Sequence, residues 1–342
     1  MIRRISAARW ILRLGALSLA LIAIALPATS FAKIASSEQG TKGMPKEVSL
    51  GVFVRSIHNI NFKDSTAEID IFLFAETKEA SNPLDSLEIL NAEIKNKSSE
   101  GHAIVSGEHV YSARLDLLVR IPYDLSSYPL DTQELVLIFE DIVKDNSQLR
   151  FVPHKEPHKA TRVGRIVNLP GYMMGKPKIE ISSYEHIGGL RAILHATPQG
   201  IPETITYSRA TFRLPIKREG IGYYFKLLGS VFLAAAVAFL SFFIKPTNVD
   251  PRFGLGVAAI FAVVASNFVL SSLLPETHEI SLGEAILFLT YLSIFATLTV
   301  SVFSLHLYET GKENIGRRLD LICGCLAPLI YAAATLFLGS WL

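Results

Sequence analysis

Residues 253–274, FGLGVAAIFAVVASNFVLSSLL, decide the fold of this chain, because they form the second of four apolar segments in its last third. The stretch has no ionisable side chain and is about as long as the ~20 residues that a helix needs to cross a bilayer core. Steps of three and four along a helix return to one face. Such a face either lets a neighbouring helix pack closely or lines a narrow passage between copies of the helix. Here the face gathers small and aromatic side chains: Gly254, Ala258, Phe261, Ala265, Phe268 and Ser272.

Residues 219–342 are expected to form an all-α transmembrane domain of four helices. Each apolar segment is long enough to span a bilayer, and the short connections make neighbouring helices antiparallel. Lys245 lies in the first connection and Arg317 and Arg318 in the third, whereas residues 275–279 carry neither Lys nor Arg. The positive-inside rule therefore turns the second connection outward. The expected helices are 223–244, 253–274, 282–307 and 319–342.

The N-terminus has the pattern of a secretory signal. Arginines precede an apolar run, Leu14–Leu26, that is short for a membrane span, and Ser30 and Ala32 fit a cleavage site. We therefore expect residues 1–32 to be a signal peptide, with a retained N-terminal anchor as the alternative. Removal of the signal would leave the next domain in the periplasm or outside the cell, in agreement with the loop charges. The expected location is the bacterial inner (cell) membrane.

Residues 33–218 are expected to form an all-β sandwich of the immunoglobulin-like kind. Apolar and polar side chains alternate in several short runs, as half-buried strands require. Turn signals such as Asn82-Pro83 and Ser106-Gly107 separate these runs. Many short strands with frequent turns indicate an antiparallel sandwich. The clearest runs are 68–74, 111–120, 134–139 and 209–216.

Composition argues against several other classes of protein. Lys and Arg number 33 against 31 Asp and Glu, so no basic field points to nucleic acid. Cys323 and Cys325 are two residues apart and would point in nearly opposite directions on a helix, so neither a disulfide nor a metal pair is expected. His154 and His158 are separated by Pro157, which favours a solvated loop over a metal site. We expect no enzyme activity, cofactor or metal, because the sequence has no nucleophile with a positioned base, phosphate loop or zinc helix.

The strongest local motif lies in residues 121–135, IPYDLSSYPLDTQEL. By itself it predicts a strand, a compact loop restricted by two prolines, and a second strand. Its centre, residues 128–133 (YPLDTQ), resembles the Phe-Pro-Phe-Asp-x-Gln signature of the pentameric ligand-gated ion channels. Ile121 and Leu135 stand where animal members of that family carry the loop-closing cysteines, as is typical of its bacterial members.

Further motifs extend the resemblance from about Val48 to the end of the chain. Residues 252–256, RFGLG, resemble the start of the family's pore helix, and Pro275 fits the loop that leaves it. Asp320 and Pro328 resemble positions in its last helix. The resemblance implies a homopentamer in a lipid membrane with the second helix lining a central pore. Pore lining thereby becomes the expected role of the stripe described above.

In a channel of this family the stripe would form stacked rings around the pore. Rings of Phe261 or Phe268 would exclude ions by dewetting, because benzyl groups cannot replace an ion's hydration shell. Asp250 would form an acidic ring at the cytoplasmic mouth, which favours cations, whereas Pro251-Arg252 resembles the anion-selective branch. We expect a cation-selective pore lined by Asp250 and the six stripe residues. The alternative is a non-conducting membrane receptor or structural binding module of the same architecture.

The resemblance also implies a gating interface between the two domains. Charge at this boundary would couple them, because the loss of one partner of a partly desolvated ion pair is costly. An ordinary surface pair, worth less than about 1 kcal/mol, is the alternative. The residues of the expected interface are Lys63, Asp64, Tyr128, Pro129, Asp131, Gln133, Lys217, Arg218, Pro275 and Glu276.

The expected ligand site lies near residues 188–203, where the family has a mobile capping loop. Phe74, Tyr172, Tyr184 and Tyr207 stand near the positions of its aromatic boxes, and a core or rim role is the alternative for each tyrosine. The exported domain has no tryptophan, whose face binds cations best, so a quaternary-amine agonist is not expected. A small molecule, a proton or a divalent ion stays open as the effector.

Overall fold

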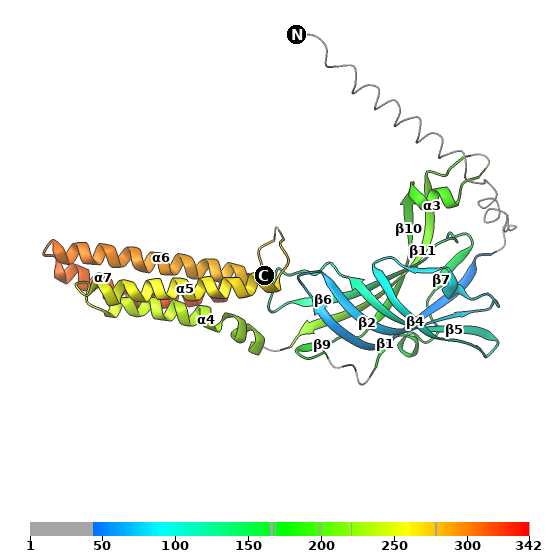
Figure 1. The fold of residues 1–342 in the computed structure, drawn as a ribbon, viewed down its shortest axis with the longest axis horizontal. Coiled ribbons are helices and arrows are strands. Elements are labelled where there is room, and N and C mark those ends of the chain that lie inside the picture. The colour runs from blue at the N-terminus through cyan, green and yellow to red at the C-terminus, as the bar shows by residue number, and fades with distance from the viewer. Residues whose placement is uncertain are drawn as a thin grey trace, which may run out of the picture. The chain divides into compact units, whose positions relative to one another are not determined.

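The computed structural model describes residues 44–342 except 165, 166, 168, 198, 199, 220, 278 and 342. The expected signal peptide, residues 1–32, lies outside the described residues. Two β-sheets make up the N-terminal part of the described chain, and four long helices make up the C-terminal part (Figure 1). The expected fold class, an all-β sandwich followed by an all-α four-helix domain, is therefore confirmed.

The first sheet has the strand order β4-β5-β2-β1-β7. Its first four strands are antiparallel, whereas β7 and β8 pair with β1 in parallel. Ile69 in β2 lies opposite both Ile57 and Leu117, so that apolar residues line up across the sheet. The strands are β1 (Lys46–Asn61), β2 (Thr66–Thr77), β4 (Ala92–Val105), β5 (Glu108–Arg120), β7 (Leu149–Val152) and β8 (Arg162–Val163).

The second sheet has the strand order β10-β11-β6-β3, and β9 pairs with the end of β11. Strand β11 is central, because β10 and β6 flank it on opposite edges. It ends at Arg218, just before helix α4 begins at Ile221, so the strand leads directly towards the membrane helices. The strands are β3 (Leu87–Ile89), β6 (Thr132–Asp141), β9 (Tyr172–Met174), β10 (Lys178–Ile187) and β11 (Thr204–Arg218); the short helices are η1 (Pro83–Asp85), α2 (Pro157–Ala160) and α3 (Gly189–Leu194).

Both sheets contribute to one apolar core. Alternate residues of their strands point inward, as the sequence pattern predicts, because successive side chains of a strand face opposite sides. Burying this apolar area is the main stabilising contribution, at about 25 cal/mol per Å² removed from water. In β2 and β11 the buried set is Ala67, Ile69, Ile71, Leu73, Ala75, Ala210, Phe212, Leu214 and Ile216.

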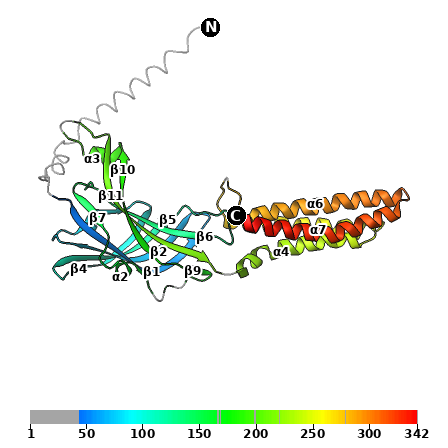
Figure 2. The same cartoon turned by 180° about the vertical axis from the view of Figure 1, so that it is seen from behind.

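The four long helices lie side by side as a bundle (Figures 1 and 2). All four are long and apolar enough to cross a membrane, which indicates a multi-pass membrane protein. They are α4 (Ile221–Leu240), which is continued by the short 3-10 helix η2 (Ser241–Phe243), α5 (Val249–Leu273), α6 (Leu282–Glu309) and α7 (Glu313–Trp341).

Two helices begin earlier than the hydropathy pattern predicts. Helix α5 already includes Asp250 and Arg252 in its first turns. Helix α7 begins at Glu313, so Arg317 and Arg318 belong to the helix and not, as expected, to the connection before it. A hydropathy criterion stops at charged residues, whereas a helix can continue beyond the apolar core of the bilayer, where water solvates its charges. The basic residues still lie near the helix ends, which is what the orientation argument uses.

Candidate functional site

The loop between β5 and β6 is bonded to the first turns of two membrane helices. Tyr128 is buried, and its hydroxyl shares a 2.8 Å hydrogen bond with the hydroxyl of Tyr223 in α4. The backbone N–H of Gly283 donates to the carbonyl oxygen of Tyr128 at 3.0 Å, and that of Leu282 donates to Ser126 at 2.8 Å. The loop therefore contacts α4 through a side chain and α6 through the backbone.

Asp131, the last residue of this loop, lies at the centre of a buried polar network. Its Oδ1 accepts a hydrogen bond from Nε of Arg218 at 2.9 Å, and its Oδ2 accepts one from Nε2 of Gln133 at 2.7 Å. The side-chain oxygen of Gln133 also accepts from the backbone N–H of Asp124 at 3.1 Å. Asp131 and Gln133 are two residues apart, and alternate residues of an extended chain face the same side. This spacing lets their side chains bond to each other.

Four aromatic rings surround the guanidinium group of Arg218. The distances from its Cζ to the ring centroids are 5.2 Å for Phe62, 5.0 Å for Tyr128, and 4.7 Å for both Tyr172 and Tyr223. Burial lowers the pKa of Arg218, but the hydrogen bond and charge of Asp131 outweigh burial, so the net pKa is raised. Burial raises the pKa of Tyr172 to about 12, which keeps this phenol neutral. Arg218 is thus a buried permanent cation held by one carboxylate and four rings.

The other residues of the expected gating interface contribute less to this buried network. Asp64 accepts a hydrogen bond from Nδ2 of Asn61 within its own turn at 2.7 Å. Pro129 is buried and is joined to Tyr128 by a cis peptide bond. The buried charge at the boundary is therefore that of Asp131 and Arg218. The remaining members are exposed or half-buried: Lys63, Lys217, Pro275 and Glu276.

The stripe on α5 faces away from the rest of the chain. Phe261 and Phe268 are 69% and 79% exposed. The opposite face, which includes Val263 and Leu270, is buried in a cluster with residues of α4 and α6. A continuous exposed apolar patch of this kind marks a contact with a partner or with lipid. All seven expected pore residues are exposed: Asp250, Gly254, Ala258, Phe261, Ala265, Phe268 and Ser272.

Two glycines of α5 lie on different faces of the helix: Gly256 on the face that packs against α6, and Gly254 on the stripe. A Cβ atom on Gly256 would overlap Cδ2 of Leu298 in α6, so this glycine permits close packing of the two helices. A Cβ atom on Gly254 would meet nothing within 4 Å. The sequence left open whether the small residues of the stripe serve close packing. Within this chain Gly256, which lies outside the stripe, permits close packing, whereas Gly254 of the stripe does not contact a neighbouring helix.

Arg252 points into the helix bundle and not towards the stripe. It is 0% exposed, and its two terminal nitrogens donate to the two carboxylate oxygens of Asp320 in α7. Its Nη1 also donates to the carbonyl oxygen of Ile244 at 3.1 Å, and Ser304 donates to Asp320 at 2.7 Å. Asp250, two residues earlier, is exposed. The acidic side chain is therefore accessible at this end of α5, whereas the basic one is neutralised inside the bundle.

The four aromatic residues of the expected ligand site do not form one cluster within the chain. Tyr184 and Tyr207 are cross-strand partners on β10 and β11. Tyr172 pairs instead with the last residue of β11, at the far end of that strand. Phe74 belongs to the other sheet, where its ring centroid lies 6.5 Å from that of His154. Only Tyr184 and Tyr207 lie together next to the segment 188–203.

A charged cluster beside Tyr207 was missed by reasoning from the sequence. Glu140 is fully buried, accepts a hydrogen bond from Nε of Arg209 at 2.6 Å and lies 2.8 Å from Nε2 of His186. Arg191 of α3 approaches the same carboxylate at 3.3 Å. In the sequence Glu140, His186 and Arg209 look like ordinary polar positions of alternating strands. They meet because β6, β10 and β11 are neighbours in one sheet.

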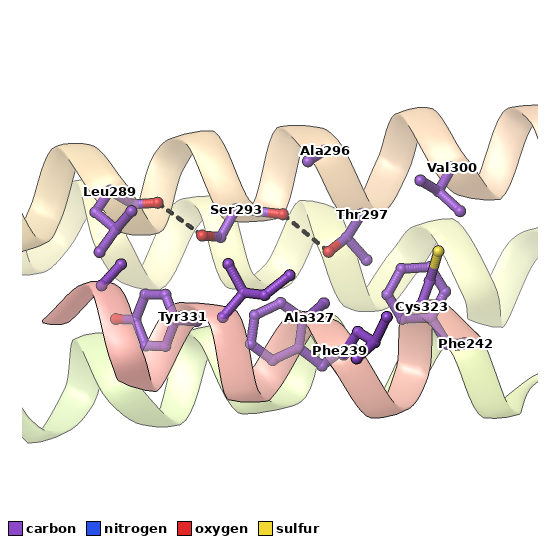
Figure 3. A pocket seen from close by; sticks show the side chains of 13 residues that line it. Phe239, Phe242, Leu289, Ser293, Ala296, Thr297, Val300, Cys323, Ala327 and Tyr331 are labelled. Carbon is purple, nitrogen blue, oxygen red and sulfur yellow. Dashed lines mark hydrogen bonds between the residues drawn. The ribbon is translucent and has the colours of Figure 1, made fainter. Parts of the chain in front are cut away.

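A cavity of about 310 Å³ lies among α4, α6 and α7 (Figure 3). Phe239 and Tyr331 contribute aromatic walls, and Cys323 contributes a free thiol. The hydroxyls of Ser293 and Thr297 both donate to carbonyl oxygens one turn earlier in α6, at 2.8 Å. The cavity is therefore apolar, and these hydroxyls are already engaged with their own helix.

The described residues contain no group of three or more His, Cys, Asp or Glu side chains arranged to hold a metal ion. His154, one of the two histidines weighed in the sequence, pairs with Glu76 at 3.0 Å. Comparison with models of known protein families finds no match for this chain.

Proposed function

We propose that the chain is one subunit of a pentameric ligand-gated ion channel, with α5 lining a central pore. The observation that carries the proposal is the exposure of the whole α5 stripe, while the opposite face of the same helix is buried. A helix that is apolar on every face is normally covered on every face. Copies of the subunit around a closed rotation axis would bring their stripes together at the centre.

Phe261 and Phe268 are proposed to form the gate. Rings of their side chains at a narrow point would offer ions and water no hydrogen bonds, so the pore would empty of water there and stop conduction. Opening requires only a tilt or rotation of α5 that moves these rings apart. The two positions lie two turns of helix apart, which provides two successive barriers along the axis.

Cation selectivity is supported by the different positions of Asp250 and Arg252. An exposed carboxylate repeated around the cytoplasmic mouth attracts cations. Arg252 would add no opposing ring, because its guanidinium group is buried against Asp320. Reversal potentials in a sodium chloride gradient test this point. A reversal potential near the chloride equilibrium potential would show that Asp250 does not select the permeating ion.

Coupling between ligand binding and the pore is proposed to run through β11 and the loop between β5 and β6. Arg218 ends β11 close to the start of α4, and its partner Asp131 is the last residue of the loop that bonds α4 and α6. A shift of β11 would therefore move the cation within its aromatic cage and pull on two helices. We further propose that the sandwich is periplasmic and that the protein lies in the inner membrane.

Ion flux through liposomes that contain the purified full chain tests the proposed function. The assay covers a range of pH and of divalent cations, because the effector is open. Phe261→Ser should conduct without any effector, since a hydroxyl ring keeps the constriction wet. Phe288→Ser in α6, where Phe288 is also exposed, is the matched control and should behave like the wild type. Flux that is absent from both the wild type and Phe261→Ser would contradict the channel.

A non-conducting receptor of the same architecture is the second candidate. It is favoured by the few polar positions of the stripe, where only Asp250 and Ser272 have side chains that bind water. The same liposome preparation separates the two functions. Saturable binding of a ligand without flux at any pH would support the receptor.

A further inference from the structure

Three buried polar atoms at the end of the bundle where α5 begins have no hydrogen-bond partner among the described residues. They are Nε of Arg252 and the hydroxyl oxygens of Ser241 and Ser301. None of these three residues is more than 1% exposed. Folded proteins pair nearly all polar groups that they bury, either with other protein groups or with bound water. We call these three residues the Arg252 cluster.

Ser241 is held next to Arg252 by the short helix η2. Nη1 of Arg252 donates to the carbonyl oxygen of Ile244 at 3.1 Å. The backbone N–H of Ile244 in turn donates to the carbonyl oxygen of Ser241 at 3.2 Å. Ser241 and the residue that Arg252 contacts therefore belong to the same turn.

Ser301 lies at the level of Arg252 on the neighbouring helix α6. Helices α5 and α6 run antiparallel, as two contacts along them show: Gly256 with Leu298, and Leu270 with Gly283. Arg252 lies one turn before the first of these contacts in α5, and Ser301 lies one turn after it in α6. Ser304, one turn further along α6, donates to Asp320, which also binds Arg252. Ser301 therefore lies on the same buried face as a member of the Arg252–Asp320 contact.

The hydroxyl of Ser301 behaves differently from other hydroxyls of α6. A buried Ser or Thr in a helix commonly donates to the carbonyl oxygen one turn earlier. Ser301 makes no such bond within the part of the chain that the structure describes, so its hydroxyl is available to another partner. The residues of α6 that do donate to their own helix are Thr290, Ser293, Thr297 and Thr299.

The chemistry of the three atoms selects the kind of molecule that fits between them. Nε of Arg252 can only donate, whereas a serine hydroxyl can donate or accept. The charge of Arg252 is already balanced by Asp320, so an added anion would leave a net negative charge among apolar helices, which is costly. A cation would be repelled by the guanidinium group. A small neutral molecule that accepts and donates hydrogen bonds meets these conditions, and water is such a molecule.

Solvent has a route towards the cluster. A pocket of about 750 Å³ opens beside the first turns of α7. Ile244 and Asp320, which both accept hydrogen bonds from Arg252, line this pocket together with the charged side chains of Lys245 and Arg317. The polar wall keeps the pocket hydrated up to the residues that hold Arg252.

We propose that the Arg252 cluster is a binding site for internal water. The water accepts a hydrogen bond from Nε of Arg252 and bonds the hydroxyls of Ser241 and Ser301, directly or through a second water. It thereby joins η2, α5 and α6, whereas the Arg252–Asp320 contact joins α5 to α7. This site goes beyond the proposed function, because it requires neither a pore nor an effector.

Thermal unfolding of the assembled full chain in detergent tests the proposal through the sign of a shift. Ser301→Ala and Ser241→Ala should each lower the unfolding temperature by about 2 °C, because the water and Nε of Arg252 lose a partner. Without a bound water the same substitutions would raise this temperature, because each removes an unpaired buried hydroxyl. A rise or no change in either variant would overturn the site.

Two further variants make the unfolding experiment specific. Ser293→Ala is the matched control on α6, because its hydroxyl donates to the carbonyl oxygen of Leu289 in its own helix, and it should unfold like the wild type. The double variant of Ser241→Ala with Ser301→Ala should lose less than the sum of the single losses, since both hydroxyls bind the same water or linked pair. A loss equal to the sum would overturn the shared site.

Two measurements identify the bound molecule. A density map of the assembled protein that resolves water should show a peak at about 3 Å from Nε of Arg252, and Ser301→Ala should weaken it. A wild-type map without this peak would overturn the site. The unfolding shift of Ser301→Ala should be equal in sodium chloride and in sodium gluconate at the same ionic strength. A shift that occurs only in chloride would assign the site to a halide ion and overturn the assignment to water. None of these readouts needs ion flux, so a failure of the channel and a failure of the water site are distinguishable.

Discussion

The sandwich and the helix bundle each bury one arginine against one aspartate, and the two pairs are constructed differently. The guanidinium group of Arg218 makes a single hydrogen bond to the Asp131 carboxylate and is otherwise enclosed by aromatic rings. Arg252 makes a two-point contact with Asp320, and a hydroxyl and a carbonyl complete the cluster. Within the described residues each guanidinium group keeps one buried nitrogen without a hydrogen-bond partner: Nη2 of Arg218 and Nε of Arg252.

This difference indicates which of the two ion pairs can change its geometry without losing its stabilising contacts. A two-point arginine–carboxylate contact has a fixed direction, so the Arg252 pair locks α5 to α7. Ring faces attract a cation over a range of positions, so the cage around Arg218 tolerates displacement while keeping the charge stabilised. A coupling element has to shift, whereas a structural lock must not. We therefore expect Arg252 to matter mainly for stability and Arg218 for both stability and gating.

Arg252→Ala should have the largest effect on stability. It leaves the Asp320 carboxylate buried among helices without its partner, which costs about 3–5 kcal/mol in comparable cases. Thermal or denaturant unfolding of the assembled protein in detergent measures the loss. Arg213→Ala, at a partly exposed pair on β11, should cost less than about 1 kcal/mol. Near-equal losses for the two variants would show that the Arg252 pair is not a lock.

Arg218→Ala should destabilise the protein by about 3 kcal/mol, at the lower end for a buried pair, because Gln133 still donates to Asp131. It should also reduce effector-dependent flux in liposomes. Arg218→Lys keeps a cation in the cage but loses the directed hydrogen bond, so it should recover stability more than flux. Wild-type flux from Arg218→Ala would remove this pair from the coupling path.

Two matched substitutions in α5 extend the comparison from ion pairs to packing. Gly256→Ala should cost about 1–3 kcal/mol, because the new methyl group overlaps Leu298. Gly254→Ala should be neutral or stabilise by up to about 1 kcal/mol, because its Cβ meets open space and alanine favours the helix. Unfolding of both variants under identical conditions measures the difference. A loss at Gly254 as large as that at Gly256 would place the stripe in a packed interface.

Tyr223→Phe should have a smaller effect, about 1 kcal/mol, because it removes one hydrogen bond to the buried hydroxyl of Tyr128 and keeps the ring in the cage. Unfolding experiments with Tyr224→Phe on the next residue of α4 provide the control. Tyr224 makes ring contacts with Phe225 and Phe232, which the substitution preserves. If the control loses as much stability as Tyr223→Phe, the hydroxyl pair does not anchor the loop to α4.

Alkaline pH should weaken the cage least of all these changes. The folded-state pKa of Tyr172 is raised by burial to about 12, above its ordinary value of about 10. Folding therefore favours the protonated phenol, and this contribution is complete below pH ~10 and is lost as the pH rises towards ~12. Unfolding midpoints measured between these values should fall less steeply for Tyr172→Phe. An unchanged slope would mean that Tyr172 does not titrate within the cage.

Much of the architecture could be predicted because it depends on local periodicity. The alternating runs became strands of two sheets, and the four apolar segments became four helices. The spacing of Phe261 and Phe268 was enough to place both on one face, which the structure shows to be exposed. Helix starts were predicted less well, as α7 shows. Hydropathy identifies only the residues that lie in the bilayer core, whereas backbone hydrogen bonds continue the helix beyond it.

The candidate sites were only partly predictable, because their members come from distant parts of the chain. Tyr172 was expected near the ligand, but its strand β9 pairs with the end of β11 and places the ring against Arg218. Arg191 and Glu140 drew no attention in the sequence, since polar residues in strands and connections usually face water. Their meeting depends on strand order, which no short pattern contains.

The sequence by itself determined the two-part architecture and the common face of the α5 stripe, because the direction of a side chain in a strand or helix follows from its position alone. Tertiary structure decided which face each charge takes. It turned Arg252 inward to Asp320, enclosed Arg218 in four rings and placed Arg191 beside the buried carboxylate of Glu140. The physical reason is that a buried charge needs partners, and those partners are supplied by elements that become neighbours only when the chain folds.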